Sequence, residues 1–152
     1  MRFITVRGLL TDHISPYHRR LTETFRRYLS GELPPRVRLL VEYLVEYEEK
    51  RVDAIRSFIQ ELSGDETIER WTPYPDTPLV LDESSFDRET FADFDRLAGL
   101  LLVCRSRLVE FLDACASAAT DPLVRRIFLS LRLQEERGMK RFARQIQGLS
   151  DL

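Results

Sequence analysis

The sequence is poor in residues that interrupt regular structure, because only 6 glycines and 7 prolines occur among 152 residues. This scarcity excludes a collagen-like or low-complexity chain. Charge of one sign is not in excess either: 23 Lys and Arg stand against 25 Asp and Glu, a net charge of −2. A strongly basic nucleic-acid-binding protein and an acidic disordered chain are therefore excluded. The length fits a single domain over residues 1–152.

Long hydrophobic runs are also absent. The longest, Leu100 to Cys104, is far below the ~20 residues that a membrane span needs, and Arg7 interrupts the early apolar stretch that a signal peptide would require. We therefore expect no membrane association. Only two cysteines occur, Cys104 and Cys115, and about three helical turns separate them, too far for a disulfide. With no CxxC spacing, we expect reduced, buried thiols in a cytoplasmic protein.

Four helical stretches are predicted from hydrophobic periodicity, and prolines and glycines mark their ends. The first begins at Ser15-Pro16, or near Thr11 with a kink at Pro16, and ends near Gly31. The four stretches cover about residues 15–30, 35–63, 89–119 and 122–148.

The connection between the second and third stretches, about residues 64–88, is polar and contains Pro73, Pro75 and Pro78. Prolines at that density disfavour a helix and favour an extended segment that can run the length of a helical bundle. The other connections are short, so they join antiparallel neighbours. The sequence therefore predicts an all-α fold, a four-helix bundle of two antiparallel hairpins joined by a long crossover.

Each predicted helix has an apolar stripe at steps of three and four residues, and each stripe is interrupted by a polar or missing side chain. The interrupting positions are His18, Glu48, Arg51, Arg105, Glu135 and Gly138. In each hairpin, a position on the first helix lies thirty residues before one on the second, His18 before Glu48 and Arg105 before Glu135. Equal spacing places them at equal heights, so we expect all six positions to converge at one level of the bundle.

Several segments resemble a known family. Val45 to Arg51 is similar to the second helix of the ferritin-like superfamily, and Asp121 to Phe128 with Gln134 to Arg137 is similar to the fourth, in particular to small rubrerythrin-type proteins. The resemblance covers nearly all of the four predicted helices. That family builds a di-metal centre from one Glu on helices one and three and a Glu-x-x-His motif on helices two and four. Glu48 and Glu135 match the glutamates of the two motifs.

The chain departs from this pattern at the other four positions. Arg51 and Gly138 stand where the resemblance places histidines, and His18 and Arg105 stand where it places carboxylates. A carboxylate-bridged metal pair needs negative oxygen ligands and neutral imidazoles, whereas two guanidinium groups repel metal ions. We therefore expect a vestigial site with no metal cofactor, and we do not carry over the ferroxidase or peroxidase activity of the family.

Three functions stay open. The favoured one is a non-catalytic ferritin-like protein that acts through protein contacts, in which two arginines and two glutamates form an internal network. The first alternative is a metal-dependent oxidoreductase with iron or manganese in an atypical centre, where His18 joins the two glutamates as a ligand. The second is a small-anion binding module in which Arg51 and Arg105 hold the anion.

The third predicted helix is apolar on more than one side. Leu100, Leu102 and Val103 lie off its main stripe, and Gly99 allows close approach. Either the crossover or a second subunit covers this face. The crossover residues available for this are Trp71, Tyr74 and Leu79. We expect a homodimer through the face; the sequence names no other protein partner.

Overall fold

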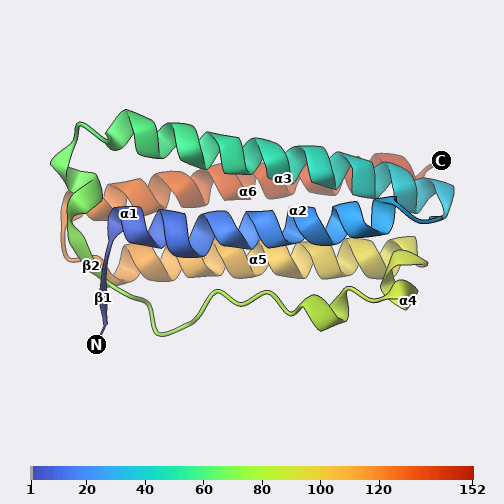
Figure 1. Cartoon of the computed structure of the whole chain (residues 1–152), viewed down its shortest axis with the longest axis horizontal. Coiled ribbons are helices and arrows are strands. Elements are labelled where there is room, and N and C mark those ends of the chain that lie inside the picture. The colour runs from blue at the N-terminus through green and yellow to red at the C-terminus, as the bar shows by residue number, and fades with distance from the viewer. Residues whose placement is uncertain (1) are drawn as a thin grey trace.

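The structure, a computed structural model, describes residues 2–152 and is all-α apart from one small two-stranded sheet. Four long helices lie side by side along one axis (Figure 1). These helices are α2 (Ser15–Leu29), α3 (Pro35–Leu62), α5 (Phe94–Ala118) and α6 (Pro122–Ser150). Short turns join α2 to α3 and α5 to α6, and one long crossover joins the two pairs. The predicted all-α class is confirmed.

The first helical stretch begins at Val6 rather than at Ser15. Helix α1 (Val6–Leu9), a π-helical turn (Leu10–Ile14) and α2 follow one another without a break. Ser15 has helical backbone angles, and the cap is instead Thr5, whose Oγ1 accepts a hydrogen bond from the Gly8 N–H. The ring of a helical proline clashes with the carbonyl of the preceding turn. The wider π turn lies directly before Pro16, where that clash would fall.

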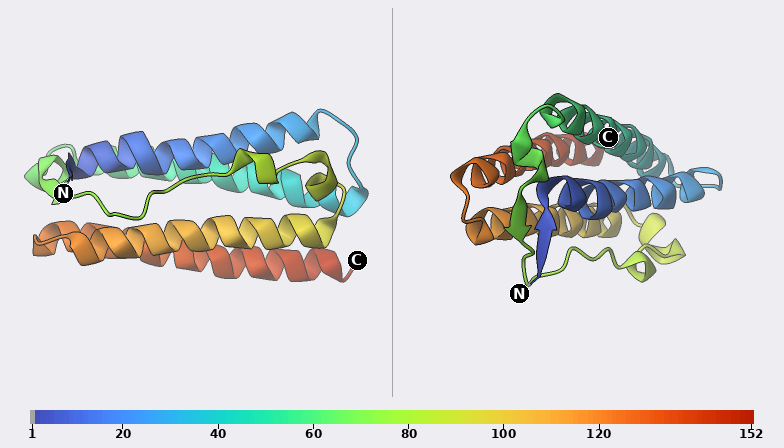
Figure 2. Two further views of the ribbon diagram at one scale, coloured as in Figure 1. Left: turned by 90° about the horizontal axis from the view of Figure 1, so that it is seen from below. Right: turned by 60° about the vertical axis from the view of Figure 1, so that its left-hand side comes forward.

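The crossover runs along the groove between α2 and α5 (Figure 2). Its first part contains strand β2 (Trp71–Pro73), which pairs antiparallel with β1 (Phe3–Thr5) so that Phe3 lies opposite Pro73. The extended character of this segment follows from its prolines, but its pairing with the N-terminal strand was not predicted. Three short helical elements complete the crossover: η2 (Glu66–Glu69), η3 (Glu83–Ser85) and α4 (Arg88–Phe91).

Helix α5 begins at Phe94, whereas the sequence analysis placed its start at residue 89. Asp93 has an extended backbone and its Oδ1 accepts a hydrogen bond from the Arg96 N–H at 3.2 Å, so it caps α5. The residues before it form the separate helix α4. The predicted stretch is therefore helical at its start, as expected, but it is divided into two helices at residues 92–93, where a capping aspartate restarts the helix.

The crossover covers part of α5, but not with all of the expected residues. Tyr74 packs edge-on against Phe111 of α5, with ring centroids 6.3 Å apart, and Leu79 packs half-buried against the core. Trp71 is 68% exposed and covers nothing. Val103 on α5 is 45% exposed, so part of the apolar face stays open.

Both cysteines are free and buried, as predicted. Burial raises the pKa of the Cys104 thiol and raises that of Cys115 to about 12, so neither thiol is activated as a nucleophile at neutral pH. Among residues 2–152, none of the helices combines the length and the apolar character that a membrane crossing requires.

Candidate functional site

Five polar side chains from all four long helices meet inside the molecule, as the thirty-residue spacing predicts. We call them the central cluster: His18 on α2, Glu48 and Arg51 on α3, Arg105 on α5, and Glu135 on α6. All but Arg51 are at most 5% exposed, and the Arg51 side chain is 12% exposed. Buried charges are rare unless they are paired, so the pairing inside the cluster determines its chemistry.

His18 lies between the two carboxylates. Its Nδ1 is hydrogen-bonded to Glu48 Oε2, and its Nε2 lies 3.4 Å from Glu135 Oε1, a longer contact without hydrogen-bond geometry. The two ring nitrogens thus face different carboxylates. An imidazole placed this way interacts most favourably with both when both nitrogens carry protons.

The arginines tie the two hairpins together. Arg105 on α5 donates from Nη2 to Glu48 Oε1 at 3.1 Å, and Arg51 on α3 donates from Nε to Glu135 Oε1 at 3.0 Å. The Arg105 guanidinium also lies over the Tyr47 ring, 4.1 Å from its centroid. Because each arginine is engaged by a carboxylate, the arrangement does not support an anion held between Arg51 and Arg105 inside the bundle.

The sixth predicted position, Gly138, makes room for Tyr47, which the sequence analysis did not single out. A Cβ added at Gly138 would lie 1.9 Å from the Tyr47 Oη. The phenol therefore occupies the space next to α6 where the resemblance places a histidine. No spacing rule identifies Tyr47; only the missing side chain at Gly138 signals that another residue fills this gap.

The pKa values of the cluster follow from its pairing. Burial lowers the pKa of His18, but the charges of Glu48 and Glu135 outweigh burial and raise it to about 9. Burial raises the pKa of Glu135, but the charges of His18 and Arg51 outweigh it and lower it to about 2. At neutral pH the cluster therefore holds an imidazolium and two guanidinium groups against two carboxylates, a surplus of one positive charge.

These donors do not fit a metal centre. Metal ligation needs a neutral imidazole nitrogen and carboxylate oxygens that converge on one point. Here the imidazole of His18 lies between the carboxylates, and its two nitrogens face Glu48 and Glu135 rather than a shared point. Within residues 2–152, no group of three or more His, Cys, Asp or Glu side chains is arranged to hold a metal ion.

Two adjoining clefts lie on the outer side of the cluster, between α3 and α6. The tyrosine cleft, of about 400 Å³, is lined by Tyr43, Glu46, Tyr47, Lys50, Arg51, Ala54 and Arg141. The cationic cleft, of about 450 Å³, is lined by Arg51, Gln134, Arg137, Lys140, Arg141 and Arg144. Arg51 belongs to the central cluster and to both clefts, so it connects the buried charges to the surface.

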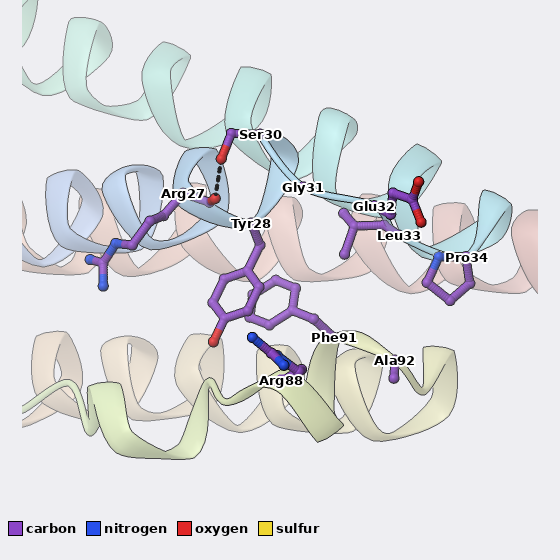
Figure 3. Close-up of a pocket in the computed structure, with 10 residues that line it drawn as sticks. All are labelled: Arg27, Tyr28, Ser30, Gly31, Glu32, Leu33, Pro34, Arg88, Phe91 and Ala92. Atoms are coloured by element: carbon purple, nitrogen blue, oxygen red, sulfur yellow. Dashed lines mark hydrogen bonds between the residues drawn. The ribbon is translucent and has the colours of Figure 1, made fainter.

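A third cleft, of about 360 Å³, lies at the turn between α2 and α3, and no residue of the central cluster lines it (Figure 3). The Tyr28 ring stacks on Phe91 there, with ring centroids 3.7 Å apart. This stack attaches α4 to α2 and anchors the end of the crossover. We assign this cleft a structural role.

No family model, curated protein or solved structure matches the chain. The functional assignment therefore depends on the geometry of the central cluster and of the clefts beside it.

The shifted pKa of His18 predicts a stability that depends on pH. A histidine whose pKa is about 9 in the folded state and 6.5 in the unfolded chain stabilises the fold fully below pH 6.5. This contribution, on the order of 3 kcal/mol, is lost as the pH rises from 6.5 through 9. Urea unfolding at pH 6, 7.5 and 9 is expected to show this decline, and His18→Gln should be less stable at pH 6.

The same variant supplies the control, because its stability should change little between pH 6.5 and 9. No other described histidine titrates there: burial lowers the pKa of His13, the second histidine of the chain. An equal decline in wild type and His18→Gln would show that His18 is not the titrating group.

The close approach of Tyr47 to Gly138 predicts that Gly138→Ala destabilises the fold. Overpacking a core typically costs ~1–3 kcal/mol, which outweighs the gain of roughly 1 kcal/mol from replacing a helical glycine. Gly148→Ala on the same helix is the matched control, because its added Cβ meets nothing within 4 Å, and it should stabilise. Tyr47→Phe should partly rescue Gly138→Ala in thermal unfolding; without any rescue, the hydroxyl is not the clashing group.

Proposed function

We propose that this chain is a non-catalytic protein of the ferritin-like type, in which the central cluster replaces a di-metal centre and which acts through protein contacts. The observation that carries this proposal is the position of His18 between the carboxylates of Glu48 and Glu135. A protonated imidazole and two guanidinium groups supply the positive charge that metal ions would otherwise bring to these carboxylates.

The arrangement of the helices supports the ferritin-like assignment. Two helical hairpins joined by a long crossover have the connectivity of that superfamily. The central cluster takes its members from all four long helices, as a di-metal centre would, and its two glutamates occupy α3 and α6. The arrangement of the helices is thus the one expected of that superfamily, whereas the charged side chains at its centre differ.

A homodimer through α5 is the protein contact that we propose. Val103 is 45% exposed on this helix, and a Cβ added at Gly99 would meet nothing within 4 Å, so this glycine is not needed for packing within the chain. Leu100 and Leu102 are partly buried against the core, so the exposed part of the face consists of Val103 and Gly99, which suit close approach by a second copy. We also propose a cytoplasmic location, supported by the two free, buried cysteines.

Elemental analysis of protein purified without chelator tests the proposed function against the enzymatic alternative. We expect iron, manganese and zinc far below one equivalent per chain, because the cluster already neutralises its carboxylates. Near-stoichiometric metal would instead support an oxidoreductase with an atypical centre.

Removing one arginine should show that the cluster is an ion-paired network. Arg105→Met removes the guanidinium that donates to Glu48 and leaves His18 as the remaining charged partner of this carboxylate; breaking a buried pair typically costs ~3–5 kcal/mol. Combining it with Glu48→Gln replaces the carboxylate that has lost its guanidinium by a neutral amide and should recover part of the loss. Arg96→Met on the same helix is the control, because Arg96 pairs with Glu89 at the surface and such pairs contribute about 0–1 kcal/mol. A silent Arg105→Met, or stabilisation of wild type by iron or manganese in thermal unfolding, would contradict the proposal.

The dimer predicts a mass of two chains by light scattering at tens of micromolar. Val103→Glu should yield the single-chain mass, because it places a charge in the interface. Leu133→Glu on α6 is the matched control, since Leu133 is also 45% exposed, and it should leave the mass unchanged. A single-chain mass for wild type would refute the dimer.

A further inference from the structure

The outer face formed by α3 and α6 has a concentration of positive charge that the central cluster does not explain. The cationic cleft is lined by five basic residues and by no acidic one. Four of them lie on one face of α6: Arg137, Lys140, Arg141 and Arg144. Their spacing of three and four residues keeps them together over about 10 Å of helix.

These four side chains are exposed, and none of them forms an ion pair with another described residue. Some exposed arginines elsewhere have an acidic partner, as Arg26 has Glu49, whereas others such as Arg19 and Arg126 form no ion pair with a described residue. In a chain with net charge −2, four cations side by side on one helix face form a local patch of positive charge. Their mutual repulsion is unfavourable unless an anion offsets it.

Arg51 is the least exposed basic residue that lines the cationic cleft, and it adds a further positive charge there. It is paired with Glu135, but that carboxylate also faces His18. Because the cluster holds three cations and two carboxylates, it does not neutralise the cleft beside it. Arg51 and the four basic residues of α6 therefore all contribute positive charge to the cationic cleft.

The neighbouring tyrosine cleft limits and shapes what can bind. It shares Arg51 and Arg141 with the cationic cleft and adds the rings of Tyr43 and Tyr47. Its other wall contains Glu46, paired with Lys50 at 2.9 Å, so the excess of positive charge does not continue along α3. A short anion fits this pair of clefts better than a nucleic-acid strand or a long acidic peptide.

We propose that the cationic cleft binds a small anion carrying two or more phosphate groups, either a free oligophosphate or a nucleotide whose base lies in the tyrosine cleft. Guanidinium groups match phosphate oxygens in bidentate geometry, and several cations from two helices converge here. Apart from Arg51, the site uses no residue of the central cluster, so it does not depend on the metal-free character of that cluster.

Isothermal titration of the full-length chain at low ionic strength tests this site with two probes, tripolyphosphate and adenosine triphosphate without added metal. Wild type should bind at least one of them, with an affinity that falls as salt is added. Arg141→Ala combined with Arg144→Ala should weaken binding about tenfold or more, because each lost charged contact is worth about that factor. These side chains are exposed and unpaired, so the melting temperature should not fall.

Arg126→Ala is the matched control, because Arg126 is exposed on the same helix and lines neither cleft; its binding should equal that of wild type. Tighter binding of the nucleotide that is lost in Tyr43→Ala identifies a nucleotide, whereas equal binding of both probes identifies a free oligophosphate. No binding of either probe, an equal effect of Arg126→Ala, or tighter binding of an oligoglutamate peptide would overturn the proposal.

Discussion

Two carboxylates buried among four helices impose the main constraint on this molecule. Glu48 and Glu135 are at most 3% exposed, and an unpaired carboxylate at such depth is strongly destabilising. His18 faces both of them, and the two arginines approach from α3 and α5. Every long helix therefore contributes one charge or more to the same neutralisation, and the relative positions of the hairpins are tied to it. Removing Arg51 or Arg105 takes the guanidinium partner from one glutamate, and removing a glutamate leaves buried cations short of a carboxylate.

The sequence predicts this cluster because height along a bundle is encoded in spacing. Short turns fix the register within each hairpin, so a spacing of thirty residues within each pair places its members at one level. Spacing gives no information on rotation about the helix axis, and for that reason it could not show which arginine meets which glutamate. It also predicted a neutral group of two arginines and two glutamates, since it did not place His18 between the carboxylates as a third cation.

The errors in the predicted fold have local causes. A helix start was assigned to Ser15-Pro16 because that pair is common at helix starts, yet the π turn at Leu10–Ile14 lets the helix continue through the proline. The break before α5 had a readable signal, Asp93 in a capping position, but the apolar pattern on both sides concealed it. The pairing of β1 with β2 joins segments almost seventy residues apart, and a short strand contains no information about so distant a partner.

Gly138 and Arg51, which stand where the proposed ferritin-like pattern has histidines, affect both the interior and the surface of the bundle. Without a side chain at Gly138, the Tyr47 phenol enters the space beside α6 and its ring lies against the Arg105 guanidinium. Arg51 instead reaches the boundary between interior and surface, where its charge adds to that of α6. The glycine at 138 thus lets the Tyr47 ring fill the interior beside α6, and Arg51 places positive charge at the surface of the bundle. Under the two proposals, the paired charges hold the interior of the bundle together, and recognition of an anion takes place on its outer face.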